Sequence, residues 1–118
     1  MSSTDLKSLE SQLNEMTRQG RILDALEKFY DEHCTFQEGN LPARQGRAAQ
    51  HAHLSAFFKP LKAFNGATLH AQAVGDNATI SEWTFDMTGP DGPILWNEVL
   101  SRRWRSGKVV SERFYTAL

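Results

Sequence analysis

Two polar residues lie where the sequence pattern predicts an apolar strand face, and each of them could take part in chemistry. Asn97 lies in a strand-like segment on an otherwise apolar face, and Glu112 shares its predicted face with Phe114. A buried amide loses about 1–3 kcal/mol unless it finds hydrogen-bond partners. Asn97 therefore either bonds to its neighbours or points at a ligand. Glu112 either titrates abnormally in a cavity or marks a register that differs from the one we expect.

The other reactive side chains do not form a recognised catalytic or metal-binding set. Cys34 is the only cysteine, which excludes an internal disulfide and a multi-cysteine zinc site. His51 and His53 are two residues apart, so on a helix they point about 200° apart and cannot chelate one metal ion together. The sequence has no phosphate loop, no dinucleotide fingerprint and no Gly-x-Ser-x-Gly elbow. We therefore expect neither a metal nor a cofactor.

Three segments with strand-like alternation must position these residues: 81–88, 94–104 and 109–115. Gly89-Pro90-Asp91-Gly92-Pro93 predicts the first turn, and Ser106-Gly107 predicts a tight hairpin as the second. A tight second turn pairs Trp104 with Val109, and the pairs Arg102–Ser111, Leu100–Arg113 and Glu98–Tyr115 follow. If the first loop keeps parity, one mainly apolar face carries Trp83, Phe85, Met87, Leu95, Asn97, Val99, Ser101, Glu112 and Phe114. A one-residue slip or a bulge would exchange the two faces.

The opposite face of these strands is amphipathic and suits an interface between two copies of the chain. We expect it to carry Trp96, Glu98, Arg102, Trp104 and Arg113. Aromatic residues and arginine are enriched in interfaces, and Glu98 can form cross-strand ion pairs with either arginine. The sequence therefore predicts a homodimer through the outer face of the sheet.

The segments before these strands are predicted to be mainly helical. Leu6, Leu9, Leu13 and Met16 form one apolar stripe that Gly20 ends, and further helices are predicted from Ile22 to about Asp31 and from Arg47 to Phe58. A short strand is expected at 34–38 and a longer one at 67–74. Three helices followed by a four-stranded antiparallel meander predict an α+β fold, in which a curled sheet closes over helices on one face.

Composition limits the class of protein. A chain of 118 residues, 40% of them hydrophobic and 23% charged, is expected to form one globular domain over residues 1–118. A net charge of −1 without a basic stripe argues against nucleic-acid binding. No apolar run approaches the ~20 residues of a membrane span, and MSSTDLKSLE lacks the apolar core of a signal peptide. We therefore expect a cytoplasmic protein without nucleic-acid or membrane partners.

Three local signatures, in this order and spacing, resemble the nuclear transport factor 2-like superfamily, and within it the SnoaL-like and ketosteroid-isomerase-like proteins. They are 24–30 (DALEKFY) followed by 35–38 (TFQE), then 42–46 opening the third helix, then 104–110 (WRSGKVV) with 113–115 (RFY). The resemblance implies a cystatin-like, cone-shaped half barrel with a curved antiparallel or mixed sheet packed on three N-terminal helices. It also implies a hydrophobic cavity between sheet and helices, and commonly a homodimer through the sheet's outer face.

The resemblance also implies positions for site residues. The general-base carboxylate of the ketosteroid-isomerase-like proteins falls on Glu38, which stands beside Gly39 and can equally be a solvated loop residue. The two oxyanion donors of that family fall near Asn14 and Val99. Valine cannot donate a hydrogen bond, so we do not expect steroid isomerisation by that mechanism. Thr116 replaces the acid that many SnoaL-like relatives carry after the last aromatic, which argues against a cyclase.

Two functional hypotheses follow. The first is cofactor-free acid–base chemistry on a small hydrophobic carbonyl or aromatic compound. In it Glu38 is the base, Asn97 and Asn14 orient the ligand, and the apolar wall is formed by Phe57, Trp83, Phe85 and Phe114. The second is a binding or dimeric interaction module of the same fold without catalysis. A hydrogen-bond donor close to the acid would favour the first hypothesis, and an isolated acid the second.

Overall fold

The N-terminal helix follows its apolar stripe. In the computed structural model, which describes residues 3–117, α1 (Ser3–Arg18) buries Leu6 and Leu13. Gly20 then adopts a positive φ of 80°, and the amide of Arg21 returns a 2.9 Å hydrogen bond to the carbonyl of Met16. Such a left-handed glycine is a common helix terminus. The helix therefore ends where the sequence predicted.

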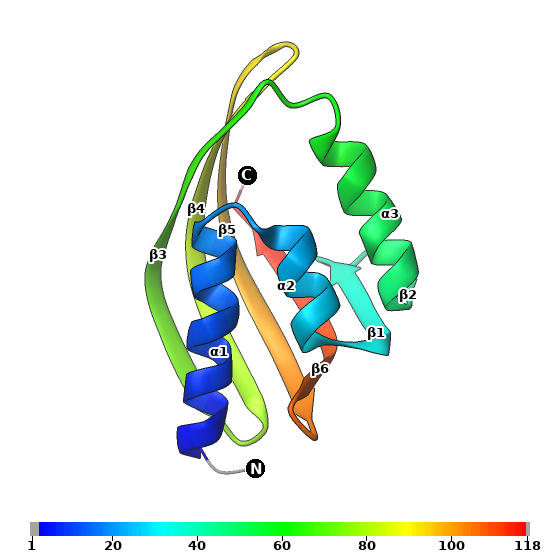
Figure 1. The fold of residues 1–118 in the computed structure, drawn as a ribbon, viewed down its shortest axis with the longest axis vertical. Coiled ribbons are helices and arrows are strands. Elements are labelled where there is room, and N and C mark those ends of the chain that lie inside the picture. The colour runs from blue at the N-terminus through cyan, green and yellow to red at the C-terminus, as the bar shows by residue number, and fades with distance from the viewer. Residues whose placement is uncertain (1–2, 118) are drawn as a thin grey trace.

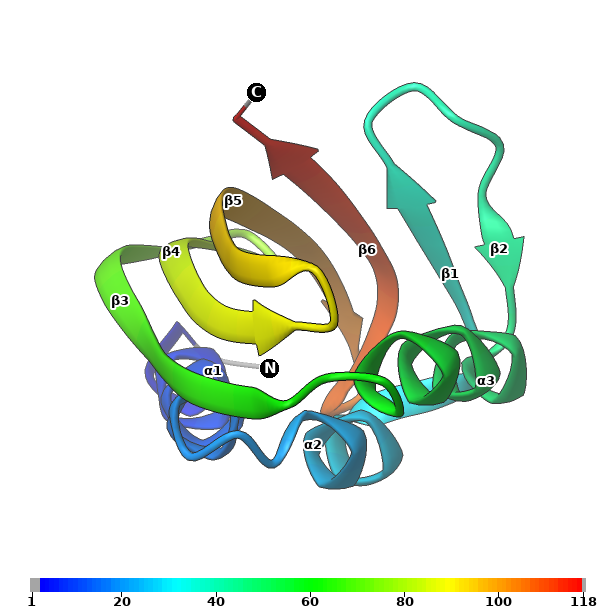
Figure 2. The same cartoon turned by 90° about the horizontal axis from the view of Figure 1, so that it is seen from above.

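Two further helices complete one layer. These are α2 (Ile22–Phe29) and α3 (Arg47–Phe58), the latter with the predicted bounds. Tyr30 already has extended backbone angles, φ −103° and ψ 139°, so α2 ends two residues earlier than expected. Figures 1 and 2 show the three helices along one side of a strongly curved sheet. The expected α+β half barrel over three helices is confirmed.

The sheet has six strands in the order β2-β1-β6-β5-β4-β3. Their bounds are β1 (Tyr30–Glu38), β2 (Arg44–Gln45), β3 (Ala63–Gly75), β4 (Ala78–Gly89), β5 (Gly92–Arg105) and β6 (Lys108–Thr116). Strands β3 to β6 form the predicted antiparallel meander. The first strand is longer than expected and pairs in parallel with β6, which makes the sheet mixed.

The predicted register of β5 is wrong by one residue. The turn before it is a two-residue turn, with Gly89 opposite Gly92, so even-numbered residues of β5 share a face with Trp83. The second turn does pair Trp104 with Val109, but a bulge between Arg103 and Trp104 shifts the rest of the β5–β6 ladder. A bulge places two residues of one strand opposite one of its partner. As a result, Arg102 pairs with Glu112 and not with the expected Ser111, and the side chain of Glu112 points inward.

Four of the five residues expected on the outer face therefore lie on the inner face. Trp96, Glu98, Arg102 and Trp104 share the concave side with Phe85 and Leu100, and only Arg113 is on the outer side. Arg102 and Trp104 are buried, at 1% and 3% exposure. Conversely, Asn97, Val99 and Ser101 lie on the outer face. The predicted inner positions of Trp83, Phe85, Glu112 and Phe114 on β4 and β6 are correct.

Two apolar clusters fill the space between the layers, and Phe114 contacts both of them. One cluster centres on α1, α2 and β1, and the other on Trp83, Phe85, Met87 and Leu100. Within residues 3–117, no helix has the length and apolar character needed to cross a membrane.

Candidate functional site

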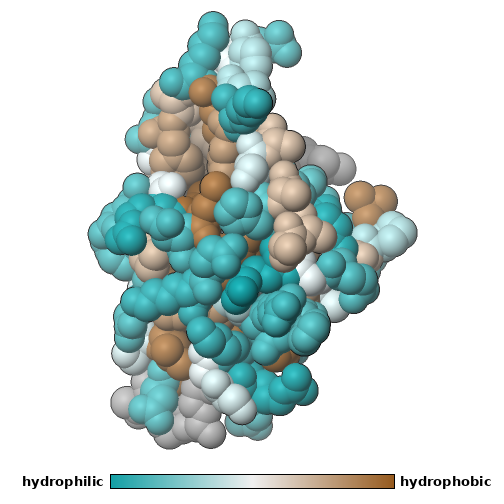
Figure 3. All heavy atoms as spheres, turned by 45° about the vertical axis from the view of Figure 1, so that its right-hand side comes forward, coloured by the Kyte–Doolittle hydropathy of each residue, from teal (hydrophilic) through white to brown (hydrophobic). Residues whose placement is uncertain are grey.

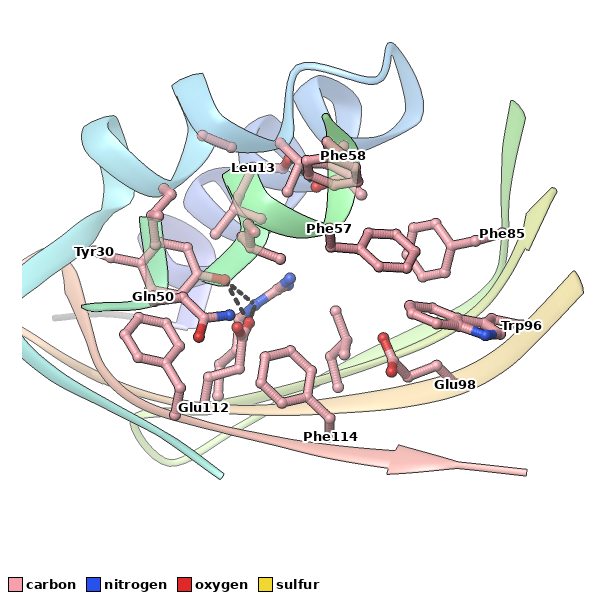
Figure 4. A pocket seen from close by; sticks show the side chains of 18 of the residues that line it. Leu13, Tyr30, Gln50, Phe57, Phe58, Phe85, Trp96, Glu98, Glu112 and Phe114 are labelled. Carbon is pink, nitrogen blue, oxygen red and sulfur yellow. Dashed lines mark hydrogen bonds and ion pairs between the residues drawn. The ribbon is translucent and has the colours of Figure 1, made fainter. Parts of the chain in front are cut away.

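A cavity of about 100 Å³ lies between the helices and the concave face of the sheet. Figure 4 shows its aromatic walls and its few polar groups. The side chains that line it come from every helix and from five of the six strands: Leu13, Thr17, Ile22, Ala25, Leu26, Tyr30, Phe36, Gln50, Leu54, Phe57, Phe58, Phe64, Phe85, Met87, Trp96, Glu98, Leu100, Arg102, Glu112 and Phe114. An enclosed apolar cavity of about 150 Å³ can bind benzene, and this cavity is smaller but partly open. The cavity therefore suits a small ring.

One end of the cavity is bounded by aromatic rings from α3 and β5. Phe57 stacks on Trp96 with ring centroids 4.8 Å apart and an angle of 25° between the planes. Trp96 is 38% exposed, and Figure 3 shows apolar side chains in the recess between the upper end of the sheet and α3. Phe57, Phe85 and Phe114 all line the cavity, as expected. Trp83 does not: it is fully buried behind Phe85 and donates its indole N–H to Ser81.

Glu98 places a carboxyl group in this aromatic surrounding. Its side chain points into the cavity between Trp96 and Phe114 (Figure 4) and accepts a 3.0 Å hydrogen bond from the Thr116 hydroxyl. Burial disfavours the charged carboxylate, and it raises the pKa of Glu98 from 4.5 to about 7. The negative charges of Glu112 and Glu38 act in the same direction, against the lowering effects of Thr116 and Arg102. Glu98 is thus poised to exchange a proton near neutral pH.

A buried polar network forms the opposite end of the cavity. Arg102 donates to Glu112 at 2.6 Å, to Tyr30 at 3.1 Å, and to Glu10 and Asn14 at 2.9 Å each. Tyr30 in turn donates its hydroxyl proton to Glu112. The buried guanidinium of Arg102 is therefore compensated by two carboxylates (Glu10 and Glu112), one amide (Asn14) and one phenol (Tyr30).

The same network shifts the pKa values of its members. Burial raises the pKa of Tyr30 well above its ordinary value, although the charge of Arg102 opposes the shift. Burial by itself would lower the pKa of Arg102, but the neighbouring Tyr30, Glu10 and Glu112 outweigh burial and raise it. Arg102 therefore stays charged, and Tyr30 stays protonated and able to donate.

Sequence reasoning missed three members of this network: Glu10, Tyr30 and Arg102. Glu10 carried a signal, because it falls between Leu6 and Leu13 on the apolar stripe of α1 and is fully buried. Arg102 was assigned to the outer face by the register error. Asn14 is buried as well, but it bonds to Arg102 and Gln72 and does not line the cavity.

Two other predicted site residues lie away from the cavity lining. Asn97 is on the outer face, where its side-chain oxygen accepts a 2.7 Å hydrogen bond from Thr84. Glu38 lies at the end of β1, 45% exposed, and forms ion pairs with Arg44 at 3.2 Å and His53 at 3.7 Å. The structure brings Glu112 to the cavity, and adds Glu98 and Gln50, which sequence reasoning had not placed there.

The described part of the chain contains no cluster of three His, Cys, Asp or Glu residues that could hold a metal ion. Cys34 is buried, and burial raises the pKa of its thiol far above the ordinary value. A protonated thiol is a poor nucleophile. The reactive groups of the cavity are therefore its carboxyls, the phenol, the amide and the guanidinium.

A known protein family accounts for most of the chain. The model of the SnoaL-like domain matches residues 12–112. This chain belongs to the SnoaL-like family. The resemblance inferred from three short signatures is thereby confirmed.

Solved SnoaL-like and related structures share the fold at low identity. A protein from Mesorhizobium loti assigned as a SnoaL-like polyketide cyclase has a TM-score of 0.82 at 20% identity, covering 98% of this chain and 99% of that one. AclR from Streptomyces galilaeus, assigned as a hydroxylase, has a TM-score of 0.81 at 12% identity, covering 98% and 91%. A protein with a ketosteroid isomerase-like fold from Catenulispora acidiphila, in complex with trimethylamine, has a TM-score of 0.69 at 13% identity, covering 81% and 75%. No curated protein sequence matches the chain.

Proposed function

We propose that this SnoaL-like domain binds a small hydrophobic carbonyl compound in its cavity and catalyses a proton transfer on it without a cofactor, with Glu98 as the acid–base group. One observation carries the proposal: of the two carboxyl groups that line the aromatic cavity, Glu98 is the one without an ion pair among residues 3–117, and its pKa is about 7. A general acid–base works best when its pKa is near the working pH.

The chemistry is a shuttle in which one proton leaves the substrate and one returns. Ionised Glu98 takes a proton from the carbon next to the carbonyl, and the electron pair of the C–H bond moves onto the carbonyl oxygen to give an enolate. The carboxylic acid of Glu98 then returns the proton to the same carbon or, in a conjugated substrate, to a more distant one. The net result is exchange or isomerisation, and no other reactant is consumed.

Glu98 takes the role that the sequence assigned to Glu38. Glu38 is paired with Arg44 and is 45% exposed, and an exposed, ion-paired carboxylate is a weaker base than a desolvated one. A carbonyl compound as substrate is consistent with the assignment of the Mesorhizobium loti protein as a polyketide cyclase, because polyketides are rich in carbonyl groups. The amide of Gln50, which also lines the cavity, adds a hydrogen-bond donor that favours catalysis over passive binding.

The test is hydrogen–deuterium exchange of cyclopentanone, a small ring ketone, in deuterated water followed by proton NMR. Wild-type protein should accelerate exchange at the carbons next to the carbonyl, with a rate that rises through pH 7 and then levels off. Glu98→Gln should lower the protein-dependent rate by at least about 100-fold. The control is Glu82→Gln, on the exposed outer face, which should exchange like the wild type.

Glu38→Gln separates the two candidate acids in the same assay. If Glu98 is the base, the Glu38 variant keeps its activity and its profile moves to slightly lower pH, because the charge of Glu38 helps to raise the pKa of Glu98. A full loss of exchange in the Glu38 variant, with Glu98→Gln active, would assign the role to Glu38 instead.

A second candidate function is binding without catalysis, and the aromatic walls favour it for small organic cations. Aromatic faces attract such cations, ionised Glu98 adds a negative charge, and the Catenulispora acidiphila relative is in complex with trimethylamine. Trimethylammonium that binds this chain more tightly above pH 7, together with no exchange of cyclopentanone, would support this candidate against the first.

We also propose a homodimer through the outer face of the sheet, with residues revised for the observed register. Leu95 and Tyr115 are exposed there, at 63% and 46%, and Arg113 lies over the Tyr115 ring at 5.1 Å. Exposed aromatic and arginine side chains are typical of interface centres.

A further inference from the structure

Gln50 is an amide in the cavity wall whose surroundings fix which atom faces the ligand. It is the one buried residue of α3, with 3% exposure, and it lines the cavity. Its side-chain oxygen accepts a 2.8 Å hydrogen bond from Nε of Arg44. Arg44 is held in turn by the carboxylate of Glu38 at 3.2 Å.

The arginine determines the orientation of the amide. A guanidinium has only donors, so the amide cannot turn its nitrogen toward Arg44 without placing two donors against each other. The nitrogen therefore occupies the opposite side, which in Figure 4 lies beside Tyr30 and Glu112 at the closed end of the cavity. Within residues 3–117 this nitrogen has no hydrogen-bond acceptor. An amide nitrogen that faces the cavity without a protein acceptor can donate to an acceptor atom of a bound ligand.

Most other donors at this end already have acceptors in the protein. The Tyr30 hydroxyl donates to Glu112, and Nε and Nη1 of Arg102 donate to four side-chain acceptors. The Gln50 amide is a neutral donor that is left for a ligand. Two carboxylates, Glu10 and Glu112, surround the single cation Arg102, and ionised Glu98 adds a further negative charge to the same space. Like charges repel in a poorly solvated site. A ligand that carries a carboxylate is therefore disfavoured.

We propose that Gln50 donates a hydrogen bond to the carbonyl oxygen of a neutral ring ketone or related carbonyl compound, and that Arg44 is the positioning residue that keeps this donor turned inward. The proposal rests on the function proposed above and specifies its substrate: neutral, carbonyl-bearing and not a carboxylate. The same hydrogen bond would stabilise the enolate oxygen as negative charge develops on it.

The test compares three probes of similar ring size: cyclopentanone, cyclopentane and cyclopentanecarboxylate. Binding is followed by the proton–nitrogen NMR signals of side-chain amides, with the Gln50 pair identified by its absence from the Gln50→Leu spectrum. In the wild type, cyclopentanone should move the Gln50 signals, cyclopentane should bind without moving them, and the carboxylate should bind at least about tenfold more weakly than cyclopentanone.

Variants then separate the donor from its support. Gln50→Leu should weaken cyclopentanone about three- to tenfold, the value of one hydrogen bond, and leave cyclopentane unchanged. Gln50→Glu, which keeps the size and the contact with Arg44, should weaken cyclopentanone as well, so the result does not depend on whether the leucine variant folds. Arg44→Met should weaken it to a smaller extent. The control is Gln45→Leu, on an exposed glutamine of β2, which should bind like the wild type.

Two results would overturn the inference, and they differ in what they leave standing. Equal cyclopentanone affinity in wild type and both Gln50 variants, with Glu98-dependent exchange intact, removes the Gln50 role and keeps the proposed function. Failure of cyclopentanone to bind the wild type at all removes both.

Discussion

The carboxyl of Glu98 should make the stability of the folded chain depend on pH. Its pKa is raised from 4.5 to about 7 in the folded state, so between these values the folded state holds more protons than the unfolded chain. Stability contributed by this group is full below pH 4.5 and is lost as the pH rises through 7.

We therefore expect Glu98→Gln to unfold with nearly the wild-type free energy at pH 5 and to be more stable than wild type at pH 8. The gain should be on the order of 1–3 kcal/mol, reduced by the solvent that reaches a partly buried group. Urea titrations of both proteins at the two pH values measure it. The same difference at pH 5 and pH 8 would mean that Glu98 is not desolvated.

Arg102 compensates two buried carboxylates, and its loss should be costly. Arg102→Met leaves Glu10 and Glu112 without their shared cation, and breaking such a buried pair costs about 3–5 kcal/mol. The adjacent Arg103→Met is the matched control, because Arg103 is exposed and donates only to Ser101. Denaturant unfolding compares the two, and a loss below about 1 kcal/mol for Arg102→Met would show that the network contributes little.

The sequence could predict individual residues only where their burial followed from local pattern. Phe57, Phe85 and Phe114 line the cavity as expected, because the inward faces of β4 and β6 and the bounds of α3 were predicted correctly. Asn97 was predicted either to bond to its neighbours or to point at a ligand, and the answer depended on which face of the sheet it occupies. It lies on the outer face and accepts a hydrogen bond from Thr84. The helical pattern predicted that Tyr30 points inward, but not its hydrogen bonds to Arg102 and Glu112, which are 72 and 82 residues away. The pattern gave no signal for Gln50.

At the scale of elements, the β5–β6 hairpin turns through two residues with positive φ, Ser106 at 51° and Gly107 at 80°. Two-residue turns of this kind prefer Asn-Gly, because a left-handed conformation is costly for most other residues and tolerated by asparagine. Ser106→Asn should therefore stabilise the fold by about 0.5–1 kcal/mol. Thermal unfolding measures the change, and a lower midpoint would contradict this account of the turn.

The helices and the existence of the strands could be predicted because apolar periodicity and turn residues are local. The register could not, because it depends on two features that the alternation of residues does not contain. These are the two-residue length of the Pro90-Asp91 turn and the bulge beside Trp104. Each shifts a strand by one residue, and one residue moves every side chain to the other face.

At the scale of the whole molecule, the corrected register changes the residues that test the proposed dimer. Tyr115→Glu places a charge on the outer face and should shift the sedimentation mass toward that of a monomer. Trp96→Glu, at the rim of the cavity on the inner face, should leave the mass unchanged. The reverse pattern would place the interface at the cavity mouth, and an unchanged mass for both would exclude this part of the outer face.

The fold as a whole was predictable from the order of three weak signatures, since the matched family spans residues 12–112. Fold does not determine function, because the same scaffold supports unrelated sites. The site depends on which side chains the curved sheet turns inward. That set could be identified only from the three-dimensional structure, which places Glu98 and Glu112 in the cavity lining and Glu38 outside it.

The most direct test of this account is the titration of Glu98 itself. Carbon-13 NMR of the glutamate side-chain carboxyls, with Glu98 assigned by its absence from the Glu98→Gln spectrum, gives the pKa of this group in solution. The account predicts a pKa of about 7 for Glu98 and a further shift when cyclopentanone occupies the cavity. A pKa near the ordinary 4.5, unaffected by cyclopentanone, would contradict a desolvated carboxyl in the cavity and with it the proposed proton transfer.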